Sequence, residues 1–153
     1  GTEPSPKNDT DLLSDNLMPY QLTGHTHQTE VGHNLGLPVY FTPAVGDWFR
    51  GIELVISAQL RDAYDLDEIR QNFEVKYAGE PLVELVDDAP LVRDNAGLHV
   101  ARIGGFSLDA KNRRFVVCVT LDNLLKGAAT QAIQNMNLAC GYDELTGIDL
   151  AGE

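Results

Sequence analysis

The sequence predicts an α+β domain in which helices cover one face of a mostly antiparallel, mixed sheet. The order of the segments is one reason: strands come first, then a helix, then more strands and a last helix. A second reason is the stretch 51–60, where apolar side chains alternate with a mixed second face, as in a sheet covered mainly on one side. The length of 153 residues fits a single domain.

The chain opens on a polar segment. Residues 1–18 carry two prolines and scattered acidic residues, so we expect a lead-in or linker there and the compact domain over residues 19–153. Residues 38–42, Pro-Val-Tyr-Phe-Thr, predict a short strand that Pro43 ends. The alternating stretch 51–60 predicts a half-buried strand.

A helix is predicted over residues 66–78 because apolar residues recur there at helical spacing. Asp65 is the expected N-cap, with a glutamate three residues on as in a capping box, and Gly79 is the expected C-cap glycine. Pro81–Val86 predicts the next strand.

Two antiparallel strands are predicted over residues 98–106 and 113–121. Asp109–Asn112 supplies the turn residues between them, and Gly104–Gly105 indicates a bulge or a close approach of another backbone.

The last helix is predicted over residues 122–139. Its apolar face is wide, with small residues in the middle, and Gly127 would cost about 1 kcal/mol in a helix interior. Two interpretations stay open: the helix touches a second surface, or it is a simple core helix.

The formal net charge is −12. Such a chain repels phosphate backbones, so neither nucleic acid nor an anionic membrane is an expected partner. No apolar run approaches the roughly 20 residues that span a bilayer. An anionic ligand would require cations concentrated at one site, and the cations next to glycine or asparagine turns are Arg50, Arg93, Arg102 and Lys126.

Cys118 lies in an apolar strand-like run and predicts a buried small hydrophobe, and Cys140 follows a helix-like run. Neither has a CxxC partner, so we expect a reducing, cytoplasmic compartment. The N-terminus lacks an initiator Met and the features of a signal peptide, which indicates an excised segment.

Titratable groups gather in Gly24–Glu30. His25 and His27, at i and i+2 on an extended segment, would project to the same side, with Glu30 near. Imidazole titrates near neutrality and suits proton transfer. Solvated loop histidines are the alternative. A metal site with His33 as a third ligand is a further alternative, but the spacing departs from that of a cupin, and we expect no metal.

The residues then resemble a known family. The runs Leu121–Leu138 and Gly141–Ile148 resemble the C-terminal signature of N-acetyl-gamma-glutamyl-phosphate reductases. Gly24–Glu30 resembles the family's histidine motif, and Phe41–Pro43 with Arg50–Ile52 resembles its next segment. The resemblance covers about residues 16–150.

The resemblance implies a glyceraldehyde-3-phosphate dehydrogenase-like C-terminal domain that binds substrate and pairs subunits. It implies reduction of N-acetyl-glutamyl 5-phosphate to the semialdehyde with NADPH, in arginine biosynthesis, through a thioester on a cysteine. That cysteine and the nucleotide-binding domain would lie upstream, so the chain alone would be an inactive fragment with its own N-terminal domain and further copies as partners.

The resemblance also implies roles for particular residues. His25 or His27 would be the acid/base, and the motif does not decide between them. Arg50 and Glu30 would contact the small-molecule substrate. The expected contacts to NADP, which the missing domain would mainly bind, are Asn123, Lys126 and Gly127.

Three positions depart from the family's pattern. Thr26 replaces an arginine between the histidines, Thr29 replaces a proline, and Ala44 stands where a histidine is usual. These departures keep open the alternative of a divergent, non-catalytic oligomerisation module. The histidines and Glu30 keep open that of a metal-binding β domain.

Overall fold

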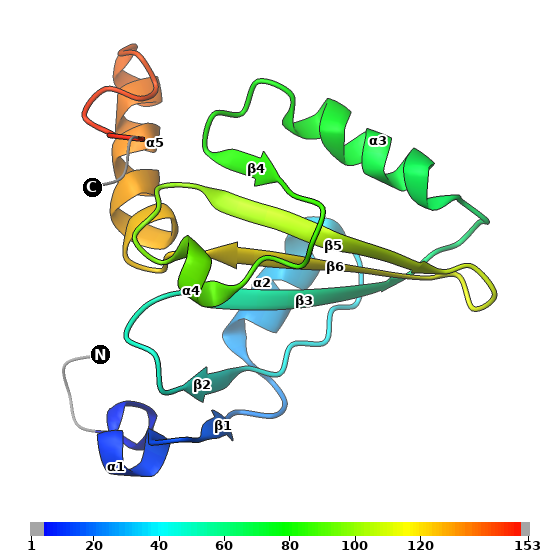
Figure 1. Cartoon of the computed structure of the whole chain (residues 1–153). Coiled ribbons are helices and arrows are strands. Elements are labelled where there is room, and N and C mark those ends of the chain that lie inside the picture. The colour runs from blue at the N-terminus through cyan, green and yellow to red at the C-terminus, as the bar shows by residue number, and fades with distance from the viewer. Residues whose placement is uncertain (1–4, 151–153) are drawn as a thin grey trace. The chain divides into compact units, whose positions relative to one another are not determined.

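The computed structural model describes residues 5–150 (Figure 1). Contacts divide the chain into two compact units, Gly1–Phe49 and Arg50–Glu153, and each is described by itself.

The first unit holds short elements and one longer helix. They are η1 (Pro6–Asn8), α1 (Thr10–Leu13), β1 (Leu17–Pro19), α2 (Thr26–Leu35) and β2 (Ala44–Gly46). β1 and β2 pair antiparallel, with Leu17 opposite Gly46. A Cβ on Gly46 would lie 2.1 Å from the ring of Trp48, so the indole lies directly against this backbone.

The prediction of a strand over residues 38–42 is wrong. This segment is irregular, and the strand β2 begins after Pro43. Prolines bracket the segment, and a proline cannot donate to a strand ladder. The Pro43 carbonyl accepts from the Tyr20 N–H at 3.0 Å, so pairing with the β1 side starts only there.

Within the predicted lead-in, α1 and β1 are formed and Leu13 is buried.

A four-stranded sheet organises the second unit, in the order β3-β6-β5-β4 (Figure 1). Its strands are β3 (Ile52–Gln59), β4 (Val83–Leu85), β5 (Ala101–Asp109) and β6 (Arg114–Leu121). β6 is antiparallel to β3 and β5, whereas β4 runs parallel to β5. The helices of this unit are α3 (Leu66–Tyr77), α4 (Val92–Asn95), η2 (Leu125–Ala129) and α5 (Thr130–Cys140). The α+β prediction is confirmed.

The connections follow the predicted chemistry. Asp65 caps α3 by accepting from the Glu68 N–H at 2.7 Å, and Gly79 after the helix has a φ of 84°. Asp109 accepts from Asn112 in the β5–β6 turn. The predicted bulge appears as a register shift between Gly104 and Ser107.

Helix α3 covers one face of the sheet. Ile69 of α3 is buried with Ile103, Phe115 and Val117 of the sheet, and Phe73 meets Phe106 edge to face at 5.1 Å. A second core cluster joins Leu82, Val100 and Ile148 with the half-buried Ile133 of α5. The two clusters attach both helices to the same sheet.

Strand β3 corrects the prediction of a half-buried strand. All of its side chains are exposed, including Val55 at 65% and Ile56 at 44%. The alternation is real, but β3 is an edge strand, and the core under α3 is built from β5 and β6. Pairs across the ladder set the two faces, so Val55 shares its face with Cys118 and Val116 rather than with the α3 core.

The last helix begins later than predicted. A wide π-helical turn, η2, precedes α5, and its hydrogen bonds join residues five apart, Gly127 N–H to Asp122 carbonyl and Ala129 N–H to Leu124 carbonyl. On α5 the buried residues are polar: Thr130, Gln134 and Asn137. The small and apolar residues Ala128, Ala129, Ala132, Met136 and Leu138 are exposed.

No helix within residues 5–150 combines the length and the apolar character needed to cross a membrane.

Replacing Ile69 by alanine tests the packing of α3. We expect a loss of about 2–5 kcal/mol in the free energy of unfolding, because Ile69 is 8% exposed in the core. Val75→Ala on the same helix is the matched control, since Val75 is 72% exposed and alanine favours helices. Urea denaturation measures both, and equal effects would contradict the described packing.

Candidate functional site

The histidine motif sits at the start of α2, not on an extended segment as predicted. Gly24, with a φ of 69°, turns the chain into the helix, and His25 is the N-cap. The His25 Nδ1 accepts a hydrogen bond from the His27 N–H at 3.2 Å. The first turn of a helix has N–H groups without helical partners, and an imidazole acceptor here meets one of them.

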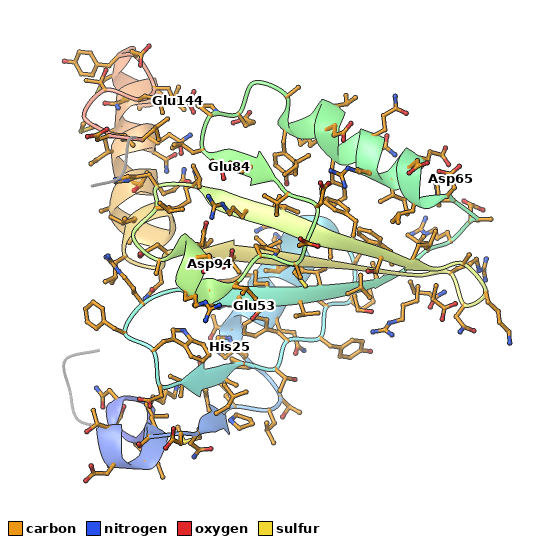
Figure 2. All side chains as sticks on the ribbon, in the orientation of Figure 1. His25, Glu53, Asp65, Glu84, Asp94 and Glu144 are labelled. Atoms are coloured by element: carbon orange, nitrogen blue, oxygen red, sulfur yellow. The ribbon has the colours of Figure 1, made fainter. Side chains whose placement is uncertain are left out.

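The two imidazoles nevertheless come together, as expected. Their ring centroids lie 4.7 Å apart, and Phe41 lies 4.9 Å from His25 and 5.8 Å from His27. Tyr20 meets His25 edge to face at 6.1 Å. Glu30 is exposed on α2, three residues beyond His27 and therefore near the same helix face. Figure 2 labels His25 at this position.

The two histidines have different surroundings. As an acceptor, the His25 Nδ1 carries no proton, which makes this ring neutral with its hydrogen on Nε2. Protonation of Nδ1 would remove the helix cap. Among residues 5–150, no hydrogen bond or ion pair engages the His27 ring. The geometry therefore separates a capping imidazole from one that is available for proton transfer.

The second unit contains a buried carboxylate that the sequence reading did not single out. Asp122, 0% exposed, accepts from the N–H groups of Gly97 at 2.7 Å, Leu124 at 2.8 Å and Leu125 at 3.1 Å. Its Oδ2 lies 3.0 Å from the Arg50 Nε. Burial raises the pKa of Asp122, but these hydrogen bonds and the Arg50 charge outweigh it and hold the pKa below its usual value.

Asn123, the residue after Asp122, binds the backbone of Gly51, the residue after Arg50. Its Oδ1 accepts from the Gly51 N–H at 2.6 Å. Gly51 has a φ of 108°, and a Cβ there would lie 2.5 Å from Val92. Asp122 and Asn123 thus hold Arg50 and Gly51 at the start of β3, and the Asn123 oxygen is engaged within the fold.

Lys126 is turned toward α5. Its Nζ donates to the side-chain oxygens of Gln131 at 2.6 Å and Gln134 at 2.7 Å. Gln134 in turn donates to Glu144, labelled in Figure 2 in the loop after α5. Burial lowers the pKa of Lys126 from its ordinary value, against the opposing charges of Glu144 and Glu80. The predicted anion contact is therefore largely committed to this network.

Gly127 differs from the other two predicted cofactor contacts, because it is exposed within the wide turn beside Ala128 and Ala129. Asn123 and Lys126 add only polar ends that are already bonded inside the chain.

Neither cysteine has the surroundings of an activated thiol. Both are free; Cys118 is half-buried rather than fully buried, and Cys140 is exposed. Burial, followed by the Glu53 charge, raises the pKa of the Cys118 thiol. Among the described residues, no three His, Cys, Asp or Glu side chains form a group that could hold a metal ion.

The fold is that of semialdehyde dehydrogenases. Aspartate semialdehyde dehydrogenase II from Vibrio cholerae, complexed with ASA, matches with a TM-score of 0.69 and 22% identity, over 85% of this chain and 42% of that one. The Francisella tularensis enzyme matches with a TM-score of 0.67 and 21% identity, over 84% and 40% of the two chains.

The chain belongs to the family described as semialdehyde dehydrogenase, dimerisation domain, which its residues 1–123 match. It is 54% identical over 148 residues to the N-acetyl-gamma-glutamyl-phosphate reductase of Xanthomonas oryzae pv. oryzae. It is 53% identical over 148 residues to Protein arg-6, mitochondrial, of Neurospora crassa. The resemblance inferred from the motifs is confirmed.

The chain spans only part of these relatives. The alignments take in 97% of this chain, but 47% of the Xanthomonas protein and 17% of the Neurospora protein.

The depressed pKa of Asp122 predicts how the fold responds to acid. A carboxyl group with a lower pKa in the folded state stabilises the fold above its unfolded pKa of about 3.9, and this stabilisation is lost as the pH falls through the folded pKa. Asp122→Asn should therefore be less stable than the parent chain at pH 7, by about 2 kcal/mol. The difference should shrink below about pH 4. Urea titrations from pH 7 to 3 measure it, and a difference that stays constant over this range would refute the assignment.

Proposed function

We propose that this chain supplies the acid/base histidine and the subunit interface of an NADP-dependent reductase that converts N-acetyl-glutamyl 5-phosphate into N-acetylglutamate 5-semialdehyde. The single observation that carries the proposal is the pair of imidazoles at the start of α2, packed on Phe41. The chain that holds them is 54% identical to the N-acetyl-gamma-glutamyl-phosphate reductase of Xanthomonas oryzae pv. oryzae. The reaction would serve arginine biosynthesis.

His27 is the proposed acid/base. His25 must keep its Nδ1 unprotonated to cap α2, whereas the His27 ring is not tied into the described hydrogen bonds. An imidazole can donate a proton to the leaving phosphate or accept one from a thiol near neutral pH. Glu30 and Arg50 are the proposed substrate contacts, one by its place on α2 near His27 and the other by its charge.

The nucleophile in this proposal lies outside the chain. The raised pKa of Cys118 disfavours the thiolate, and neither cysteine matches the family's motif. The reduced cofactor, NADPH, would supply the hydride that releases the aldehyde. The exposed turn at Gly127 offers it a supporting contact, and its main site belongs to a nucleotide-binding domain.

The open face of the sheet is the proposed interface with a second copy. Val55, Val116 and Cys118 share this face through the β3–β6 ladder, and Val55 is 65% exposed. Apolar side chains on an uncovered sheet face favour association. The family description as a dimerisation domain supports the same assignment.

A cytoplasmic location belongs to the proposal. The free cysteines agree with a reducing compartment, whereas the name of the Neurospora crassa relative places that protein in mitochondria. Fractionation of cells that produce the complete protein would decide between the two compartments.

The activity is tested on the complete product of the reading frame that encodes this chain. The reverse reaction is assayed: phosphate-dependent oxidation of N-acetylglutamate semialdehyde with NADP. His27→Asn should lower kcat by at least about 10²-fold, as expected for a lost acid/base. His25→Asn should keep much of the activity, because asparagine is also a good N-cap.

The opposite ranking of the two variants would assign proton transfer to His25 instead. A folded parent protein without any turnover would overturn the reductase proposal and favour a non-catalytic pairing module. Thr26, Thr29 and Ala44 would then be the first positions to examine.

Replacing Val55 by lysine tests the interface. A lysine beside Val116 and Cys118 should dissociate the oligomer, because a charge buried in the interface without a partner is costly. Val75→Lys on α3 is the control, since Val75 is similarly exposed, at 72%, on an element away from this face. Sedimentation velocity measures both. An unchanged oligomer with Val55→Lys would rule this face out.

A further inference from the structure

The ion pair between Arg50 and Asp122 is asymmetric. It joins the residue just before β3 to the residue just after β6, with 3.0 Å between the Arg50 Nε and the Asp122 Oδ2. The Asp122 side chain is 0% exposed, whereas that of Arg50 is 31% exposed. The carboxylate is enclosed, whereas part of the Arg50 side chain remains exposed.

The carboxylate is itself fixed from several directions. Leu124 and Leu125 donate to Oδ1, and Gly97 donates to Oδ2. Asn123 then holds the backbone of Gly51, the next residue after Arg50. A planar guanidinium paired at Nε to an immobile carboxylate loses much of its rotational freedom, so less entropy is lost when it binds an anion.

A comparison within the same unit shows that this arrangement is not general. Arg102 pairs with Glu84 of β4 at 2.8 Å, but Glu84 is 46% exposed and Arg102 is 27% exposed. That pair lies at the surface, with both partners accessible to solvent. Of these two pairs, the one with Arg50 is built on a buried carboxylate and the one with Arg102 is not.

The charge of the chain gives this cation a use. With a net charge of −12, the general field opposes the approach of an anionic substrate. A lysine or arginine on a mobile side chain would pair with different acidic residues in turn. An arginine held by one buried carboxylate keeps its planar N–H groups at one fixed position.

We propose that Asp122 is a positioning residue that holds the Arg50 guanidinium as the binding group for an oxyanion of the substrate, its carboxylate or its phosphoryl group. The inference rests on the proposed reductase function and extends it to a residue that neither the motifs nor the family description assigned.

The test is a double-variant cycle in the complete product of the reading frame. Arg50→Gln, Asp122→Asn and the double variant are assayed in the reverse reaction, where phosphate and the semialdehyde are separate substrates with separate KM values. We expect both single variants to raise the same KM by at least about tenfold, the scale of one charge-assisted hydrogen bond, with kcat changed by less than about threefold.

The two sources of the oxyanion separate in this assay. A rise in the KM for phosphate assigns Arg50 to the phosphoryl group, and a rise in the KM for the semialdehyde assigns it to the carboxylate. The double variant should be no worse than Arg50→Gln, because Asp122 acts through Arg50. Glu84→Gln, which breaks the surface pair of Arg102, is the matched control and should leave both KM values unchanged.

Additive effects of Arg50→Gln and Asp122→Asn, or two unchanged KM values, overturn the inference. If Asp122→Asn does not fold by circular dichroism, Arg50→Lys replaces it. Lysine keeps the charge but lacks the planar fork, and it should raise the same KM.

Calorimetry separates this inference from the reductase proposal. Inorganic phosphate and N-acetylglutamate are titrated into the same proteins without turnover. If the parent protein is inactive but binds one of them, and both single variants weaken that binding by at least about tenfold, the positioning role stands alone. If the parent protein binds neither, the role is refuted.

Discussion

The second unit depends on one buried carboxylate, that of Asp122. It stands where β6 ends, and it accepts hydrogen bonds from the loop before β5 and from the wide turn before α5. The pair with Arg50 adds the start of β3. A buried charge is tolerated only when its hydrogen-bonding capacity is filled, so these segments have to meet in one arrangement. The carboxylate therefore fixes the ends of three strands at once.

In the first unit, a histidine has a comparable structural role. The chain turns at Gly24, and the imidazole of His25 caps the N-terminus of α2, where a serine or aspartate is usual. This choice brings a second imidazole within 4.7 Å and packs both on Phe41. His25 caps the helix, and the His27 ring lies beside it outside the described hydrogen bonds.

The sequence predicted the sheet and α3 well because their signals are local. The alternation of β3, the cap at Asp65 and the turn at Asp109 each depend on neighbouring residues. It failed at the strand over residues 38–42 and at the exposed β3, because pairing partners and edge positions are set by distant segments.

The site was predicted in its parts but not in its connections. His25 and His27 were identified, whereas the helix cap that distinguishes them follows from three-dimensional geometry. Asp122 was missed, although an Asp-Asn pair directly after a strand is a recognisable capping signal. The pairing of Lys126 with Gln131 and Gln134 was not foreseen, because it forms across the π-helical turn.

Helix α5 differs from an ordinary surface helix because its fully buried residues are polar. It hides a hydroxyl and two amides, Thr130, Gln134 and Asn137, and shows methyl and thioether groups to the outside. The hidden amides make specific bonds, such as those from Asn137 to the carbonyls of Glu144 and Thr146. Exposed methyl and thioether groups are poorly solvated by water. This side of α5 should therefore lower the solubility of the chain wherever nothing covers it. The isolated chain should accordingly self-associate more readily than an assembly in which this side of α5 is covered.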